Sequence, residues 1–535
     1  MNKFWITLGL GLAFTFSVTA QDSILLRTEP TWFNKSLEET GVYGVNTEKA
    51  WNFLKENNRK PVELIVGILD SGVQADHIDL ADNMWVNPKE IAGNNKDDDK
   101  NGYIDDIHGW NFIGGADGQN MDGDTLEKVR IYKYVLLPLF ESDDAEQNEK
   151  NKTKHPEKYN DYQTIKLEIT NKLSEAKANL AQYTQLQQML TASFPSLIEA
   201  FGSELVTEES LSKFEPTDET MGGMFMFGIL PKEYWDGLTM EQIYNKIKNE
   251  FQGAITYFES QINYHYNVDF EPRGIVGDDY ANKKEKHYGN NDVEGPDAEH
   301  GTHVAGVIAA VRGNDLGIDG IAGNHIRIMS VRTVPNGDER DKDVANAIYY
   351  AADNGAKIIN MSFGKDYSPE KEIVWKAMKY AEKKGVLMVK AAGNDNVDID
   401  EEIHYPSNFD DKGNRVTESL LTVGASTPDA ENIKASFSNY GKINVDVFAP
   451  GTQILSTVPH DKFEEHQGTS MASPITAGVA ALVWSHYPDF TANEIKHIIK
   501  QSVNKHPDLE DISITGGVVD AYKAVQLAEE LYKKK

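Results

Sequence analysis

Short, nearly continuous apolar runs are the sequence feature that most constrains the fold of this chain. Residues 62–69 form the clearest such run, and strand-like segments follow at 326–332, 357–361, 386–389, 420–423 and 445–448. Runs without polar alternation are typical of parallel strands that are buried on both faces. Helix-like segments at 343–353 and 370–384 lie between them. The sequence therefore predicts an α/β fold with a doubly wound, mostly parallel sheet.

Residues 113–293 interrupt this alternation. The segment 165–190 is rich in Lys, Glu, Ala, Leu and Gln, which favours a long helix, and 240–265 has apolar side chains near helical spacing. A Met- and Phe-rich segment at 221–227 is predicted to be a turn. We therefore expect an inserted α-helical subdomain. Either its adaptable apolar tip leans over a substrate groove, or it packs away from the groove and adds only stability.

The N-terminal residues 1–20 have the properties of a signal peptide. Lys3 supplies a basic start, an apolar stretch follows, and small residues precede the predicted cleavage site after Ala20. The alternative is a membrane anchor, but the apolar stretch is shorter than the roughly 20 residues that a spanning helix needs. The other predicted parts are a lead segment at 21–60, an α/β domain at 61–112 and 294–535, and the insertion at 113–293.

Composition restricts the partners and the location of the protein. The formal net charge of −31 argues against nucleic acid, because the phosphate backbone would be repelled. The chain has no cysteine and hence no disulfide, which leaves bound metal as a means of stabilising an exported protein. We expect a periplasmic or extracellular protein without an integral membrane anchor, with the monomer as the default oligomeric state.

An acidic residue, a histidine and a serine, each in a distinctive local sequence, follow one another along the chain in the order Asp, His, Ser. Asp70 ends the first apolar run, at the strand end where open α/β sheets place functional residues. His300 begins the segment His-Gly-Thr-His-Val-Ala-Gly, and Ser470 lies in Gly-Thr-Ser-Met-Ala-Ser-Pro before a helix-like apolar run. A base activates a serine nucleophile, an acid orients that base, and a helix N-terminus favours developing negative charge. His303 is expected to be structural rather than a metal ligand.

At these segments the chain resembles the subtilases, the subtilisin-like serine peptidases, over about residues 40–112 and 294–535. The resemblance implies the catalytic residues Asp70, His300 and Ser470, with Asn394 as a donor to the oxyanion. It also implies two walls of a pocket for the residue before the scissile bond, formed by Ser362, Phe363 and Gly364 and by Ala392 and Gly393. The alternatives are a turn residue at Asn394 and a plain buried strand before Gly364.

An acidic segment has the spacing of an EF-hand-type calcium loop. Its oxygen donors are Asp97, Asp99, Asn101, Asp105 and the carbonyl of Tyr103. His108 stands where the closing glutamate belongs, so Asp106 or a residue from elsewhere must substitute. The alternative is a solvated acidic hairpin. The resemblance implies a second calcium site at Asp79 and Asn314, for which an ordinary surface turn is the alternative.

These features predict an exported endopeptidase that hydrolyses peptide bonds of proteins or peptides through an acyl-enzyme on Ser470, with calcium as a structural cofactor. Two alternatives stay open. A peptide ligase or macrocyclase would pass the same acyl group to an amine, and a non-catalytic homologue would only bind peptides.

Overall fold

The computed structural model describes residues 31–535, so the predicted signal peptide lies outside the described residues. Nine strands form one sheet in the order β10-β11-β7-β6-β5-β4-β1-β3-β2, in which, among the described strands, β10 and β11 alone pair antiparallel. This confirms the predicted α/β fold. The strands are β1 (Leu64–Asp70), β2 (Gly109–Asn111), β3 (Ile326–Arg332), β4 (Ile358–Met361), β5 (Leu387–Ala391), β6 (Leu420–Ser426), β7 (Val447–Pro450), β10 (Asn504–Lys505) and β11 (Gly517–Val518). A separate antiparallel pair comprises β8 (Ile454–Val458) and β9 (Lys462–His466).

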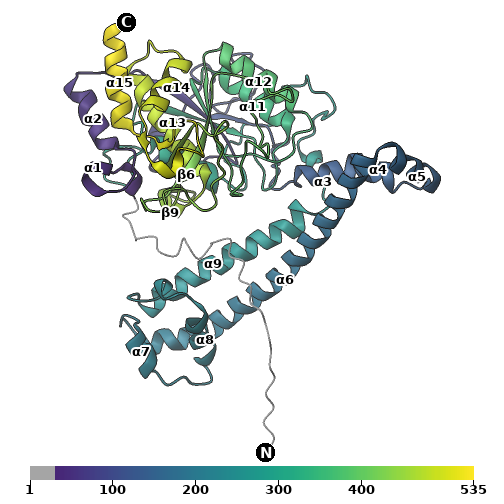
Figure 1. Cartoon of the computed structure of the whole chain (residues 1–535), viewed down its shortest axis with the longest axis vertical. Coiled ribbons are helices and arrows are strands. Elements are labelled where there is room, and N and C mark those ends of the chain that lie inside the picture. Colours follow the sequence, from purple (N-terminus) through teal and green to yellow (C-terminus); the bar gives the residue numbers. More distant parts are fainter. Residues whose placement is uncertain (1–30) are drawn as a thin grey trace, which may run out of the picture.

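Helices cover both faces of the sheet (Figure 1). One apolar core joins the sheet to α2 (Thr47–Glu56), α10 (Glu299–Ala309), α13 (Thr469–His486), α14 (Ala492–Gln501) and α15 (Ala521–Lys534). The other core joins the opposite face to α11 (Asp341–Asp353) and α12 (Lys371–Lys383). Burial on both faces explains why the central strands have apolar sequences without polar alternation. The short α1 (Leu37–Thr40) precedes α2.

The inserted segment forms a long helical hairpin that projects from this α/β body (Figure 1). Helix α6 (Pro156–Phe201) packs against α9 (Met240–Ser260), which continues as a π-helical turn over Gln261–His265. Helices α7 (Glu208–Lys213) and α8 (Met221–Ile229) form its far end. At the near end lie α3 (Glu127–Ile131), α4 (Leu137–Phe140) and α5 (Ala145–Lys154), with a π-helical turn at Tyr132–Leu136 between α3 and α4.

The hairpin has an apolar core of its own. Buried members include Phe194 of α6, Met226 of α8, and Ile243 and Ile247 of α9. The Met- and Phe-rich segment belongs to this core as helix α8, so the prediction of a turn there was wrong. Among residues 31–535, no helix combines the length and the apolar character needed to span a membrane.

Candidate active site

The predicted acid and base lie in contact. Asp70 is the last residue of β1 and His300 is the second residue of α10. His300 Nδ1 lies 2.7 Å from Asp70 Oδ1, although the two residues are 230 positions apart in the sequence. Gly301 permits this approach, because a Cβ at that position would lie 2.1 Å from the carbonyl oxygen of Gly72. The pair leaves His300 Nε2 available to a substrate or nucleophile.

Two opposing effects act on the pKa of His300. Burial lowers it, while the charge of Asp70 and the hydrogen bond to that carboxylate raise it more, so the net shift is upward from 6.5. An imidazole held in this way has one nitrogen fixed by an acid and accepts a proton at the other. The arrangement suits a general base near neutral pH.

The predicted nucleophile lies in the first turn of α13, where Ser470 is half-buried. Gly468 precedes it with φ of 146°, a conformation that favours glycine and begins the helix here. Ser470 Oγ donates to the carbonyl oxygen of Ser362 at 3.1 Å, and Ser362 Oγ donates to the carbonyl oxygen of Ser470 at 2.8 Å. These two hydrogen bonds hold Ser470 against the segment that directly follows β4.

Asn394 contacts Thr469, the residue before the predicted nucleophile, through its side-chain oxygen and not through its amide nitrogen. Its Oδ1 accepts from the backbone N–H of Thr469 at 2.8 Å and from Thr469 Oγ1 at 2.9 Å. The oxygen is thus engaged, and the exposed side chain presents its NH₂ group as a donor. Thr469 also accepts from the N–H of Gly393 at 3.1 Å. Sequence analysis missed this positioning role of Thr469, for which no local pattern is a signal.

The two predicted pocket walls face a residue that sequence analysis also missed. A Cβ at Gly364 would lie 2.2 Å from His404 Cε1, and a Cβ at Gly393 would lie 3.1 Å from His404 Nε2. His404 therefore lies against both walls. Burial, followed by the nearby Lys390, lowers the pKa of His404 well below 6.5, and Lys390 Nζ lies 3.3 Å from its Nδ1. The other wall residues, Ser362, Phe363 and Ala392, are buried.

The Asp70–His300 pair opens into a cavity of about 520 Å³ that also reaches the inserted hairpin. Ser362 lines it on the side of the body, and residues of α9 line it on the other side. The part of the hairpin at this cavity is the end of α9 that adjoins the body, whereas the Met- and Phe-rich helix α8 packs on α6. Of the two alternatives for the insertion, neither describes this arrangement fully: the apolar helix α8 lies away from the cavity, and the end of α9 near the body borders it.

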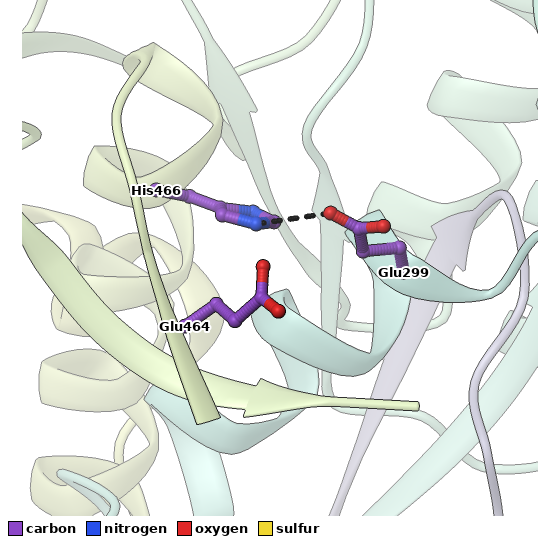
Figure 2. Close-up of side chains that lie close together, drawn as sticks. All are labelled: Glu299, Glu464 and His466. Carbon is purple, nitrogen blue, oxygen red and sulfur yellow. Dashed lines mark ion pairs between the residues drawn. The ribbon is translucent and has the colours of Figure 1, made fainter. Parts of the chain in front are cut away.

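A second group of ionisable side chains includes Glu299, the residue that precedes His300 in α10 (Figure 2). Glu299, Glu464 and His466 converge, with His466 Nε2 3.2 Å from Glu299 Oε1, and this hydrogen bond lowers the pKa of Glu299. His303 stacks on His466 with ring centroids 4.2 Å apart. His303 is buried, and its Nε2 lies 2.9 Å from the carbonyl oxygen of Ile454, as a structural histidine would.

The acidic loop brings two of the predicted calcium ligands together with one that was not predicted. Single ligand atoms of Glu90, Asp97 and Asp99 all lie within 4.8 Å of one another. Glu90 Oε1 accepts from the N–H of Asp99 at 3.1 Å, while Glu90 Oε2 is buried with no hydrogen-bond partner among the described residues. A buried, unpartnered carboxylate oxygen beside two further carboxylates fits a Ca²⁺ ion. The seven-residue spacing from Glu90 to Asp97 lies outside the EF-hand pattern, which is why it was missed.

The other predicted calcium ligands of this loop, Asp105, Asp106 and Tyr103, are in contact with other groups of the protein. Asp106 accepts from Tyr350 at 2.6 Å and from Asn101 at 3.0 Å, and burial raises the pKa of Asp106 to about 6. Asp105 accepts from the N–H of Asn95 at 2.7 Å, and its other oxygen is buried without a partner among the described residues. Tyr103 lies in an aromatic cluster and offers only its carbonyl.

Asp79 and Asn314, the second predicted calcium pair, are in contact. Asn314 Nδ2 donates to Asp79 Oδ1 at 2.7 Å, and the N–H of Ile318 donates to Asp79 Oδ2 at 3.3 Å. Asp79 is buried, and this burial raises its pKa. Both carboxylate oxygens of Asp79 are thus hydrogen-bonded, whereas Glu90 and Asp105 each keep one buried oxygen without a partner among the described residues.

Comparison with known proteins identifies a family and individual relatives of this chain. A profile of the subtilase family matches residues 62–517. The chain is 37% identical to a thermophilic serine proteinase of Bacillus sp. (strain AK1), over 51% of this chain and 61% of that protein. It is 39% identical to thermitase of Thermoactinomyces vulgaris, over 42% of this chain and 75% of that protein. A solved structure of a cold-adapted subtilisin-like serine proteinase is 28% identical, with a TM-score of 0.37, over 44% of this chain and 78% of that one.

Proposed function

The chain belongs to the subtilase family of serine peptidases, and from this we propose that it is an exported endopeptidase that hydrolyses peptide bonds through an acyl-enzyme on Ser470. The observation that carries the proposal is the 2.7 Å contact between His300 and Asp70 at a cavity that Ser362 also lines, because the same Ser362 is hydrogen-bonded to Ser470.

The residues act in a defined order. An extended peptide pairs with the backbone at Ser362 to Gly364, a mode of binding that reads any sequence. The Ser470 hydroxyl turns from the Ser362 carbonyl to His300 Nε2, which takes its proton as Oγ attacks the scissile carbonyl carbon. Asp70 holds the imidazole in the tautomer that has its proton on Nδ1 and stabilises the imidazolium.

The negative charge on the tetrahedral oxygen is met by donors that are already in place. The amide NH₂ of Asn394 and the N–H of Ser470 at the helix N-terminus stabilise it. His300 then gives its proton to the departing amine, which leaves the acyl-enzyme. A water molecule, deprotonated by His300, attacks the ester carbonyl and releases the acid product and Ser470.

We further propose structural calcium in the body. Glu90, Asp97 and Asp99 would hold one ion, for which Asp105, with a buried unpartnered oxygen, and backbone carbonyls of the loop are candidate further ligands. A second ion at Asp79 would require the Asn314 amide to turn its oxygen toward the site, because its nitrogen donates to Asp79 in this structure. Bound Ca²⁺ would stabilise a protein that has no disulfide.

Covalent labelling tests the proposal and separates it from its alternatives. A fluorophosphonate probe should label the protein, and peptide mapping should place the label on Ser470. Digestion of a peptide library should yield hydrolysed products with free carboxylates. Absence of labelling would favour a peptide-binding homologue, and cyclic or ligated products would favour transfer to an amine.

A further inference from the structure

The inserted helix α9 borders the same cavity as the catalytic pair. On the body side the cavity is lined by Asp70, His300 and Ser362, and on the hairpin side by Gly253, Thr256 and Tyr257. We propose that this face of α9 is a binding site for the segment of an extended peptide substrate that precedes the scissile bond. This inference rests on the proposed function, which places the residue before that bond against Ser362.

The direction of the bound peptide follows from the other lining residues. The loop after β3, from Val334 to Asp338, forms the cavity between Ser362 and α9. This loop is joined to the end of α9, since Asn336 Nδ2 donates to Ser260 Oγ at 2.9 Å, so a peptide that pairs at Ser362 and extends along the loop away from the scissile bond approaches α9. Its earlier residues therefore meet the inserted helix, which supplies a wall that the body alone lacks.

Gly253 is the first observation that supports a ligand-binding site on this face of α9. Glycine in the interior of a helix is unfavourable compared with alanine. Close packing does not explain it here, since a Cβ built on Gly253 has nothing within 4 Å. The glycine is exposed on the cavity, where the missing side chain leaves room for a peptide backbone.

Tyr257 is the second observation that supports a ligand-binding site on α9. Its neighbours Phe251 and Ile255 are buried in the hairpin, whereas Tyr257 is 55% exposed and lines the cavity. An exposed aromatic ring offers a flat contact to an aliphatic or cationic side chain.

The charges on the lining favour a cationic side chain over an anionic one. Asp122 and Asp297 are exposed carboxylates there. The guanidinium of Arg332 is buried, donates to the carbonyl oxygen of Met121 at 2.7 Å and offsets part of this charge, but the acidic side chains of the lining outnumber it. Asp338 and His265 also line the cavity, beside the catalytic pair. The site thus suits a peptide with a basic residue before the cleavage site.

A glycine-to-leucine exchange tests the site, because two exposed helical glycines of the hairpin differ only in place. Gly253→Leu puts a side chain into the cavity, whereas Gly228→Leu puts one on α8, where a Cβ also has nothing within 4 Å. Nitroanilide substrates with one or with four residues before the scissile bond are compared. Gly253→Leu should lower kcat/KM about tenfold for the long substrate and leave the short one unchanged, a difference of about 1.4 kcal/mol.

Binding to the inactive Ser470→Ala protein gives a readout that does not depend on hydrolysis. A fluorescent peptide with lysine before the cleavage position should bind about tenfold more weakly when Gly253→Leu is added, and Tyr257→Ala should weaken it as well. The Gly228→Leu control should bind as the parent does. A glutamate-containing peptide should bind more weakly than the lysine peptide.

The outcomes separate the two proposals. Unchanged long-substrate kinetics and unchanged peptide binding in Gly253→Leu would overturn the site on α9, and so would equal losses for the long and short substrates. A parent protein that binds the peptide through Gly253 and Tyr257 but is neither labelled nor active would overturn the endopeptidase instead. A parent that neither binds nor cleaves peptides would overturn both.

Discussion

The α/β body and the α6–α9 hairpin differ in how they are held together. The body has two apolar cores, one on each face of a nine-stranded sheet, and every predicted catalytic residue lies at its strand ends or helix starts. The hairpin has a separate core between α6, α8 and α9 and meets the catalytic face through one end of α9.

This difference suggests separate roles for the two regions: the body holds the proposed reacting groups, and the hairpin borders the cavity that leads to them. Because the body carries the proposed acid, base and nucleophile on buried elements, we expect their positions not to depend on the hairpin core. Because the hairpin borders the cavity with exposed side chains, we expect it to affect which peptides fit without altering the proposed reacting groups. Substitutions in one region should therefore leave the property of the other unchanged.

The largest effect is expected at the nucleophile. Ser470→Ala should lower kcat by about 10⁶, the loss known for removal of the nucleophile in subtilisin, itself a member of this family. The same exchange in the hairpin, Ser212→Ala on α7, should leave kcat unchanged. Steady-state kinetics with a nitroanilide peptide measure both. Residual activity of Ser470→Ala within tenfold of the parent would place the chemistry elsewhere.

Asn394→Ala should lower kcat by about 10²–10³ with little change in KM, because the amide stabilises charge that develops in the transition state; this is the loss known for an oxyanion donor of subtilisin. The exposed Asn249 of α9 provides the control, and Asn249→Ala should leave kcat as it is. A raised KM with normal kcat would assign Asn394 to substrate binding instead.

Phe194→Ala should loosen the hairpin alone. Phe194 is fully buried between Phe227 and Tyr244, and removing such a ring costs about 3–5 kcal/mol. Hydrogen exchange should accelerate in α6 and α9 while the sheet stays protected. Phe225→Ala, at a side chain that is 55% exposed on the same hairpin, is the control. Equal loss of protection in the sheet would show that the two regions unfold as one unit.

Chelation should destabilise the body and spare the hairpin, because both proposed calcium sites lie in the body. Loss of Ca²⁺ present at about 100 times its Kd costs about 2.7 kcal/mol. The double variant Asp97→Ala/Asp99→Ala should abolish most of this sensitivity, whereas Glu208→Ala/Glu209→Ala on α7 should retain it. A melting curve that chelator leaves unmoved would contradict the calcium proposal.

The smallest expected effect is a displaced pH profile. His300 must be neutral to accept the Ser470 proton, and its pKa is raised from 6.5, so kcat/KM should rise with pH through a midpoint above 6.5. Asp70→Asn removes the charge that raises the pKa, and the midpoint should fall. Hairpin variants should not move it. A midpoint at or below 6.5 in the parent would mean that burial outweighs Asp70.

Prediction from sequence succeeded where local pattern and tertiary structure agree. The predicted strand at 326–332 coincides with the observed β3, whose apolar residues Ile326, Ile328, Met329 and Val331 are all buried. The pair β8 and β9 was missed because Lys462–His466 is mostly exposed and charged, which removes the apolar signal of a strand.

Prediction of the hairpin tip failed for a different reason. Gly222 and Gly223 suggested a turn, but a Cβ at Gly223 would lie 2.4 Å from the Leu197 side chain, so close packing of α8 on α6 requires a glycine there. Glu90, Thr469 and His404 were missed as well, because their roles depend on contacts with residues that no sequence spacing relates to them.

The 230-residue separation of Asp70 and His300 bears on how the protein assembles. Closing an unstructured loop costs about 0.6 kcal/mol more for every doubling of its length, and the cost falls on the contact that joins the ends. An inserted segment that folds on its own core brings its two ends together in advance and shortens the loop that remains to be closed. We therefore expect the contact between Asp70 and His300 to form after the inserted segment has folded, so that the proposed catalytic pair is assembled later than the hairpin.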